Sequence, residues 1–469
     1  MGKGSKMFGE EKIGKLLFKF SIPIILSMLI SELYSMVDTL FVGNKVGSHG
    51  IGALALVYPV QRIIIALSTM IALGTSTAFS RSNGQDNLEN SRKIVNNGFS
   101  LAISIMITLT TIVFLFREKI LITLGSSQQI VPYAMDYLSI IIFGSTFLSL
   151  TIFISNIIIA LGNNKISIAS NSIGAITNVI LDYILVVRMG VGVKGAAIAT
   201  TVSQIIGFIY AYYNYIKIKK EYKIPSGFKL QKKIIIPIVL VGVSSFIVES
   251  EEGIVMAVLN NLLLNTVGDK GIIILGVITR IYMFLFVTMF GIASAMQPIA
   301  AYNVGARNYK RLKDIMDKTT LSAFVTSGIL WGLSMIFAPQ LISLFIKDSE
   351  IIKEAVGAYR TMVAVFPIIS IYYVSIFYYQ AMGRARYSIL ISVLRQLIIM
   401  MPMAVILVKV FNLGAMGVWL AYPISDVLSS LASYMLIKNE GEELNTRIEK
   451  QMKKEKIKKE RLKQEYVLH

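Results

Sequence analysis

The chain has 469 residues, of which 55% are hydrophobic and only 16% are charged. A soluble protein carries about 25% charged residues, so this composition argues against an ordinary cytosolic enzyme. Cys is absent and only two His occur, which excludes thiol chemistry and leaves little for a histidine metal site or a Ser-His-Asp triad. The net charge of +19 fits either a nucleic-acid-binding protein or the basic inner loops of a membrane protein.

Long apolar segments follow one another along the whole chain. A membrane-spanning helix needs about 20 such residues. Twelve segments qualify: 16–42, 51–79, 94–116, 130–161, 166–187, 195–216, 234–267, 272–301, 321–338, 355–382, 387–408 and 415–437. The first is too long for a signal peptide and lacks a clear small-residue cleavage site, so we expect it to be retained. These segments predict an all-α, multi-pass membrane protein with twelve transmembrane helices.

The basic residues between these spans are unevenly distributed. If both termini lie in the cytosol, the inner segments carry 32 Lys and Arg and the outer segments carry 9. Cytosolic loops of membrane proteins are enriched in Lys and Arg. The ratio therefore predicts a cell-membrane protein with both termini in the cytosol. Because basic inner loops account for the positive net charge, we expect no nucleic-acid partner.

Short loop motifs of the first half recur in the second half at a nearly constant offset. The repeated pairs are 46–51 with 267–272, 84–87 with 305–308, 161–162 with 382–383, and 195–196 with 417–418. Because each half has six helices, an even number, the two halves must form a parallel repeat. We predict a cytosolic N-terminus (1–15), an N-lobe of six helices (16–216), a cytosolic linker (217–233), a C-lobe of six helices (234–437) and a charged cytosolic tail (438–469).

This organisation favours a carrier. Parallel repeats in transporters place the substrate between the halves near the middle of the membrane. The chain has no Gly-x-x-x-x-Gly-Lys-Ser/Thr loop, so its energy should come from an ion gradient and not from nucleotide hydrolysis. A membrane-embedded enzyme lacks a convincing nucleophile or metal constellation. We therefore expect no enzymatic activity and no cofactor, and a monomer in membrane lipid.

Ionisable residues inside a bilayer are costly and are candidates for function. Asn178 and Asp182 are four residues apart, so they share a helix face. With Asp38 they could hold Na⁺ through carboxylate and amide oxygens, or form a pair of acids that shares a proton. The alternative is that each acid is paired with an arginine or capped by an amide and has no role in transport.

Three further acids are candidates for a substrate cavity. Glu249 and Glu252 share a face in the seventh span, whereas Glu251 points away from them. Glu32 lies at a similar depth in the first span. These acids could attract a cationic substrate. Alternatively, they could form ion pairs with Arg62 or Arg280, or be exposed to a water-filled cleft.

Two other features of the spans have alternative explanations. Tyr372 and Tyr373 lie in an aromatic stretch that could bind an organic cation through its ring faces, or that could pack against neighbouring helices. Pro23 removes one backbone hydrogen bond from the first span. The resulting kink could be a hinge or a static bend.

Several short motifs match one transporter family in order and spacing. They are Ser21-Ile22-Pro23, residues 36–43 (MVDTLFVG), Asn178 with 181–183 (LDY), 195–200 (GAAIAT), Gln297-Pro298 and 303–306 (NVGA). Over about residues 20–437 the chain resembles the MATE (multidrug and toxic compound extrusion) transporters. The resemblance implies two six-helix lobes in a V around a central cavity, and efflux of organic, often cationic compounds by H⁺ or Na⁺ antiport.

The resemblance also implies roles for particular residues. Asp38, Asn178 and Asp182 match the family's ion site in the N-lobe. Asn156 and Thr200 fall where the family places further oxygens of that site.

The resemblance extends to two other positions. Pro23 matches a proline thought to bend during transport. Glu252 falls near a glutamate that one branch of the family uses in a C-lobe Na⁺ site, but the tenth span here has no acid to complete that site. We therefore expect ion coupling in the N-lobe.

A flippase for lipid-linked saccharides is the alternative function, because it resembles this architecture. It would need a basic cavity for pyrophosphate, formed from Arg62, Arg280, Arg360 and Arg395. The three acids proposed for the substrate cavity argue against such a basic surface.

Overall fold

The computed structural model describes residues 3–124, 129–345 and 348–467, and these residues form helices and connecting loops without a β-strand. Twelve helical segments of this described part are long and apolar enough to cross a membrane. The prediction of an all-α membrane protein with twelve spans is confirmed.

The first half of the chain forms one six-helix lobe, which we call the N-lobe. A short helix, α1 (Lys3–Glu10), precedes it. The lobe comprises α2 (Ile13–Val46), α3 (Ser48–Gly84), α4 (Leu88–Thr123), α5 (Val131–Ala160), α6 (Lys165–Asp182) with a π-helical extension (Tyr183–Arg188), and α7 (Val193–Glu221).

The second half forms the C-lobe. It comprises α8 (Lys232–Val267), α9 (Asp269–Gly305), α10 (Tyr309–Ile336), α11 (Ala338–Ser343), α12 (Ser349–Met362), a 3₁₀ turn (Phe366–Ile368), α13 (Ile369–Met382), α14 (Ala385–Val393), a π-helical segment (Leu394–Met400), α15 (Met401–Lys409) and α16 (Ala415–Val467). The tenth span, predicted as one helix, is broken between α12 and α13. Pro367 lies in this break and lacks the backbone N–H that a continuous helix would use.

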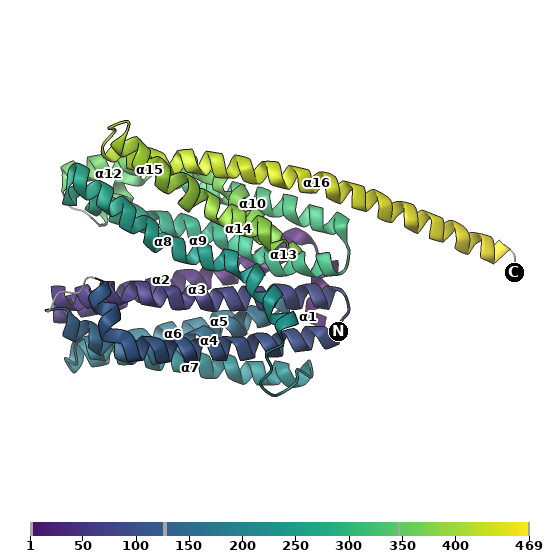
Figure 1. Ribbon diagram of the computed structural model, residues 1–469, viewed down its shortest axis with the longest axis horizontal. Coiled ribbons are helices and arrows are strands. Elements are labelled where there is room, and N and C mark those ends of the chain that lie inside the picture. Colours follow the sequence, from purple (N-terminus) through teal and green to yellow (C-terminus); the bar gives the residue numbers. More distant parts are fainter. Residues whose placement is uncertain (1–2, 125–128, 346–347, 468–469) are drawn as a thin grey trace.

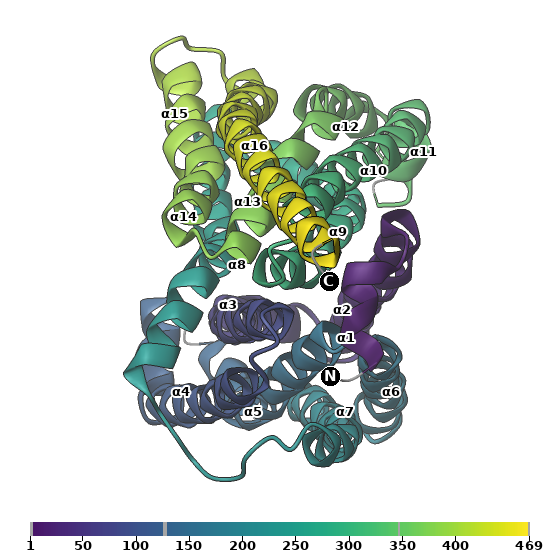
Figure 2. The same cartoon turned by 90° about the vertical axis from the view of Figure 1, so that its right-hand side faces the viewer.

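The two lobes lie side by side, and both termini lie at the same end of the molecule, on the right in Figure 1. Viewed from that end, Figure 2 shows α2 opposite α8, α4 opposite α10, and α3 beside α9 at the centre. Corresponding helices thus take equivalent places in the two lobes, on opposite sides of an axis that runs along the helices. This is the arrangement expected of a parallel repeat.

The backbone carries the same repeat. Gly47 and Gly268, which occupy equivalent positions of the two halves, both connect two spans with positive φ, at 81° and 69°. Only glycine adopts such angles without steric cost. Asn87 and Asn308, another equivalent pair, each cap the following helix by accepting a hydrogen bond from the backbone N–H three residues later.

The lobes touch most closely near the end that carries the termini. Helix α3 packs against α8 and α9 of the other lobe, and α2 packs against α9. A Cβ atom added to Gly84 would lie 1.9 Å from the carbonyl oxygen of Tyr302, and one added to Gly305 would lie 1.9 Å from that of Arg81. From this contact the ribbons of the two lobes diverge toward the opposite end (Figure 1).

The N-terminal segment reaches from the N-lobe onto the C-lobe at the same end. The side chain of Phe8 is fully buried, with its ring 6.0 Å from that of Tyr302. Its carbonyl oxygen accepts hydrogen bonds from Asn303 Nδ2 and Arg311 Nε, both at 3.0 Å. The segment before the first span therefore packs against the lobe contact.

The end of the last span differs from the expected boundary at 437. Helix α16 continues without interruption to Val467 and projects beyond the bundle (Figure 1). Just past that boundary, Glu440 is buried and forms an ion pair with Arg384, and Leu444 is fully buried. The first two turns of the predicted tail thus pack on the C-lobe through the ion pair of Glu440 and the buried side chain of Leu444.

Candidate functional site

A buried polar cluster lies inside the N-lobe where α2, α6 and α7 meet. Asp38 comes from α2, Asn178 and Asp182 from α6, and Thr200 from α7, and all four are at most 6% exposed. Asn178 Nδ2 donates a hydrogen bond to Thr200 Oγ1 over 3.2 Å. Helix α2 packs against α6, and α6 packs against α7, so the tertiary fold brings these separate motifs together.

One member of this cluster was not anticipated from the sequence. Tyr137 of α5 donates its hydroxyl to Asp38 Oδ2 at 3.4 Å, a long hydrogen bond. Nothing in the pattern around Tyr137 distinguishes it from the other tyrosines in the spans. Only the tertiary structure, which brings its hydroxyl to Asp38, could have shown its place.

The oxygen atoms of the cluster lack the donors that normally balance buried carboxylates. Asp38 Oδ1 and Asn178 Oδ1 have no hydrogen-bond partner among the described residues, and the carboxylate of Asp182 has only the side-chain amide of Asn178 beside it as a donor. The electrostatic neighbours of Asp38 and Asp182 in this part of the chain include each other and no Lys or Arg. Pairing with arginine, one part of the alternative considered from the sequence, is therefore wrong for these two acids. The other part, capping by an amide, stays open for Asp182, because the side chain of Asn178 interacts with it.

This arrangement can take up a cation or a proton. An uncompensated buried carboxylate is strongly unfavourable unless it is protonated or meets a positive charge. Two neighbouring acids in a dry interior cannot easily both be ionised, so one of them tends to hold a proton. The same oxygens, with the amide oxygen of Asn178, could instead surround Na⁺.

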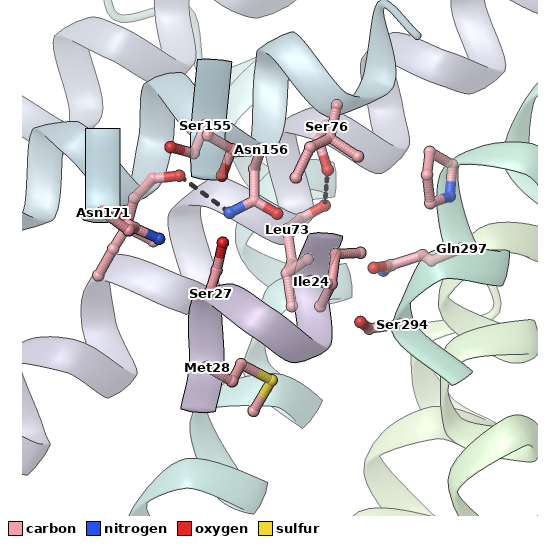
Figure 3. Close-up of a pocket in the computed structure, with 14 residues that line it drawn as sticks. Ile24, Ser27, Met28, Leu73, Ser76, Ser155, Asn156, Asn171, Ser294 and Gln297 are labelled. Atoms are coloured by element: carbon pink, nitrogen blue, oxygen red, sulfur yellow. Dashed lines mark hydrogen bonds between the residues drawn. The ribbon is translucent and has the colours of Figure 1, made fainter. Parts of the chain in front are cut away.

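Asn156, the fifth predicted member of the ion site, lies elsewhere. It lines a cavity of about 150 Å³ between α2, α3, α5, α6 and α9, together with Asn171 of α6. Figure 3 shows Asn156 beside Asn171 and Ser155, with its amide bonded to a backbone oxygen. Seven residues separate Asn171 from Asn178, which is about 10 Å along the helix, so this cavity and the carboxylate cluster are distinct.

The cavity spans the lobe contact but is uncharged. Its polar lining comes from hydroxyl and amide side chains, including Ser27 and Ser76 of the N-lobe and Gln297 of the C-lobe, and none of the described residues that line it is ionisable. Figure 3 shows Gln297 and Ser294 facing Ile24 and Ser27 from the other lobe. It is too small for most organic drugs in this conformation.

Glu32 and Glu249, two of the acids predicted to line a substrate cavity, lie near each other across the two lobes. Arg62 of α3 lies between them: its Nη2 is 3.9 Å from Glu32 Oε1, and its Nη1 is 3.9 Å from Glu249 Oε2. All three side chains are partly exposed, between 21% and 33%. The side chain of Glu252 lies outside the described residues.

The aromatic pair does not fit the predicted cavity role. Tyr372 and Tyr373 are at most 2% exposed and pack within the C-lobe. The hydroxyl of Tyr372 donates to the backbone oxygen of Ser392, and the ring of Tyr373 packs against Phe286 and Phe290. The expectation fails because helix α13 lies in the middle of its lobe, with its whole circumference covered.

The C-lobe contains a buried ion pair. Arg395 Nε donates to Asp426 Oδ1 over 2.8 Å, and Arg395 Nη2 donates to the hydroxyl of Tyr282 over 2.9 Å. Glu251 is also buried in this lobe, at 1% exposure, so it does face away from Glu249 as the helix period predicts.

Breaking this ion pair should destabilise the protein. We expect Arg395→Ala to lower the free energy of unfolding by about 3–5 kcal/mol, because the buried Asp426 carboxylate loses its counter-charge. Replacing both partners, Arg395→Met with Asp426→Leu, should recover most of that loss. Thermal unfolding in detergent measures both. Arg360→Ala, at an exposed arginine of α12, is the control, and an equal effect there would contradict the prediction.

The basic cavity required for a pyrophosphate flippase is not assembled. Arg395 is buried in its ion pair, and Arg62 lies between two acids. Arg360, an exposed residue near the C-terminal end of α12, donates to the backbone oxygen of Met335. Arg280 is exposed on α9 and is in none of the ion pairs of the described residues. Arg62, Arg360 and Arg395 thus lie in separate environments and do not form one basic cavity.

Comparison with known proteins identifies the family. The family pattern described as MatE matches residues 23–184 and again residues 245–406. Both boundaries of the second match are shifted by the same amount from those of the first, which confirms the internal repeat. The chain belongs to the MatE family and is a multi-pass membrane transporter, not an enzyme.

Individual relatives agree with this assignment. The multidrug export protein MepA of Staphylococcus aureus (strain NCTC 8325 / PS 47) is 24% identical over 431 residues, which is 92% of this chain and 94% of that protein. MepA of Staphylococcus haemolyticus (strain JCSC1435) matches to the same extent.

Solved structures show the same fold. A multidrug resistance MATE family transporter in an outward-facing conformation superposes with a TM-score of 0.88 at 24% identity, covering 94% of this chain and 98% of that one. A MATE protein in a bent conformation also has a TM-score of 0.88, at 23% identity, with 95% and 98% coverage. A fold that is found in distinct conformations is consistent with transport by alternating access.

Proposed function

We propose that this protein is a secondary antiporter that expels organic, mainly cationic compounds in exchange for H⁺ or Na⁺. The observation that carries the proposal is the pair of buried N-lobe carboxylates, Asp38 and Asp182, with no basic partner in the described structure. Such a site binds a cation or a proton readily and releases it when the site opens to the other side. The export function of the MepA relatives supports the same direction of transport.

The orientation and organisation follow from the charge distribution. We propose that the protein spans the cell membrane with both termini in the cytosol, because its basic residues gather in the loops at that end. In this orientation the lobes touch at the cytosolic end and diverge toward the outside. We propose lobes at residues 16–216 and 234–437, joined by the cytosolic linker 217–233, in a protein that works as a monomer.

Transport couples two binding events. In the outward-facing state the ion enters the N-lobe and binds Asp38 and Asp182, with Asn178 and Thr200 completing the site. Helix α2 carries Asp38, and Pro23 near its other end is the proposed hinge. Ion binding changes the bend of α2. The site between the lobes then loses its affinity for the substrate, and the substrate leaves. Ion and substrate must then weaken each other's binding by the same factor.

Gradient-driven efflux tests this function. Proteoliposomes that contain the native protein are loaded with tetraphenylphosphonium, and pH and Na⁺ gradients are imposed separately. We expect at least one gradient to accelerate loss of the cation severalfold over protein-free liposomes, and the effective gradient identifies the coupling ion. No acceleration under either gradient by correctly inserted protein would overturn the proposal.

A further inference from the structure

The ion pairs of Arg62 form a second charged site, separate from the N-lobe carboxylates. Its members come from three helices and from both lobes: Glu32 on α2, Arg62 on α3 and Glu249 on α8. Each lies near the middle of a helix of 34 or more residues. The site is therefore at mid-membrane depth, on the side of the lobe contact where the ribbons diverge.

The distances from Arg62 to Glu32 and Glu249 are long in comparison with those of a structural ion pair. Both distances to carboxylate oxygens are 3.9 Å, and the three side chains are 21–33% exposed. Arg395, by contrast, approaches Asp426 to 2.8 Å with both side chains at most 4% exposed. Partly exposed pairs contribute little to stability. The Arg62 pairs can therefore open at low cost, whereas the pair in the C-lobe cannot.

The surroundings of Arg62 have the chemistry that recognises an organic cation. The guanidinium group is itself a flat, delocalised univalent cation. It lies between two carboxylates, and its carbon is 5.2 Å from the centre of the Tyr58 ring. Its Nε donates to the Tyr58 hydroxyl over 2.6 Å. Acids on two sides and an aromatic face are the recurring elements of sites for organic cations.

We propose that Arg62 is a resident counter-cation that sets the charge preference of the interlobe substrate site. The guanidinium group of Arg62 reduces the negative charge that Glu32 and Glu249 give this site by one unit. A divalent cation bound beside Tyr58 is repelled by Arg62 more strongly than a univalent cation is, because the repulsion grows with the charge of the ligand. Arg62 thus favours univalent over divalent substrates. This inference rests on the proposed function, because it assumes that the substrate passes between the lobes.

The lobes take part in this selection. Glu249 belongs to the C-lobe, so the contact with Arg62 bridges the two lobes, whereas Glu32 and Arg62 stay within one lobe. When the lobes rearrange, Arg62 keeps one acid and is separated from the other. The affinity for a cation then changes with conformation, which an alternating-access carrier requires.

Binding of two probe cations tests the proposal without any gradient. Tetraphenylphosphonium is the univalent probe and methyl viologen the divalent probe, measured by equilibrium dialysis with the full-length protein in lipid nanodiscs. We expect Arg62→Gln to improve the affinity for methyl viologen relative to tetraphenylphosphonium by about tenfold, the effect of one added negative charge at a partly exposed site. Arg62→Lys, which keeps the charge, should retain the native ratio.

Matched variants make the outcome specific. Arg280→Gln removes an exposed arginine from α9 that is in none of the ion pairs of the described residues, and it should leave the ratio unchanged. Glu249→Gln should weaken the binding of both probes. An unchanged ratio in Arg62→Gln, with native protein that binds tetraphenylphosphonium, would overturn this inference alone. Native protein that binds neither probe would overturn the proposed substrate class as well.

Discussion

Asp38→Asn and Asp182→Asn are each expected to reduce gradient-driven efflux by about 100-fold, the upper part of the range for coupling between two sites. The amide has nearly the same shape as the carboxylate but cannot take up a proton and binds Na⁺ weakly. Both side chains are buried without a basic partner in the described structure, so no neighbouring charge can replace the lost one. Efflux of tetraphenylphosphonium from proteoliposomes, under the gradient that drives the native protein, measures the loss.

The same assay separates coupling from folding. Asp136→Asn is the matched control, because Asp136 is a half-exposed acid near the start of α5 that pairs with Lys194 Nζ at 3.2 Å. We expect its efflux to remain within about twofold of native, as for most exposed ion pairs. Binding of tetraphenylphosphonium without a gradient should persist in all three variants. Native efflux in Asp38→Asn would leave a transporter but remove Asp38 from its mechanism.

Gly84→Ala is expected to prevent the lobes from closing at the end that carries the termini. The added Cβ would lie 1.9 Å from the carbonyl oxygen of Tyr302 and 2.9 Å from the amide nitrogen of Ala306. Both are backbone atoms, which cannot rotate away as a flexible side chain can. The overlap should raise the free energy of the closed state by about 1–3 kcal/mol, which lowers its population by about 5- to 150-fold. Transport should fall in proportion, because every cycle passes through this state.

The absence of cysteine makes this prediction easy to measure. Spin labels on Gln85→Cys and Ala306→Cys, two exposed and equivalent positions of the repeat, report the distance across the lobe contact. We expect Gly84→Ala to lengthen and broaden that distance. Gly276→Ala is the control, because a Cβ there meets nothing within 4 Å. A distance unchanged from the native protein would show that the contact tolerates the methyl group.

Helix number, repeat and the main ion-site candidates could be predicted from the chain alone. A long apolar segment predicts a membrane-spanning helix, because a helix pairs all the backbone polar groups that lipid cannot solvate. The recurring loop glycines at positions 47 and 268 indicate the duplication. Asp38 and Asp182 stand out because charges in such spans are rare and costly. These features depend on composition and local spacing, which can be read directly from the sequence.

Partners between distant helices could not be predicted in this way. The sequence left open whether Glu249 meets a substrate or an arginine, and the tertiary structure places Arg62 of the other lobe beside it. Tyr372 and Tyr373 looked suitable for a cavity, but α13 is enclosed by its own lobe. A helix period shows which residues share a face, but it does not show which neighbour covers that face.

The order of residues along the chain is thus sufficient to predict a duplicated twelve-helix membrane carrier and to single out Asp38 and Asp182 as the acids proposed to bind a coupling ion. The folded arrangement was required to show that Asp38 and Asp182 lie together without a basic partner in the described residues, that Asn156 lines a separate cavity, and that Arg62 lies between two acids. Burial in the bilayer depends on local composition, so it can be predicted from a short segment. Ion pairing instead depends on the rotation and crossing of helices far apart in the chain, and side-chain packing throughout the bundle sets both.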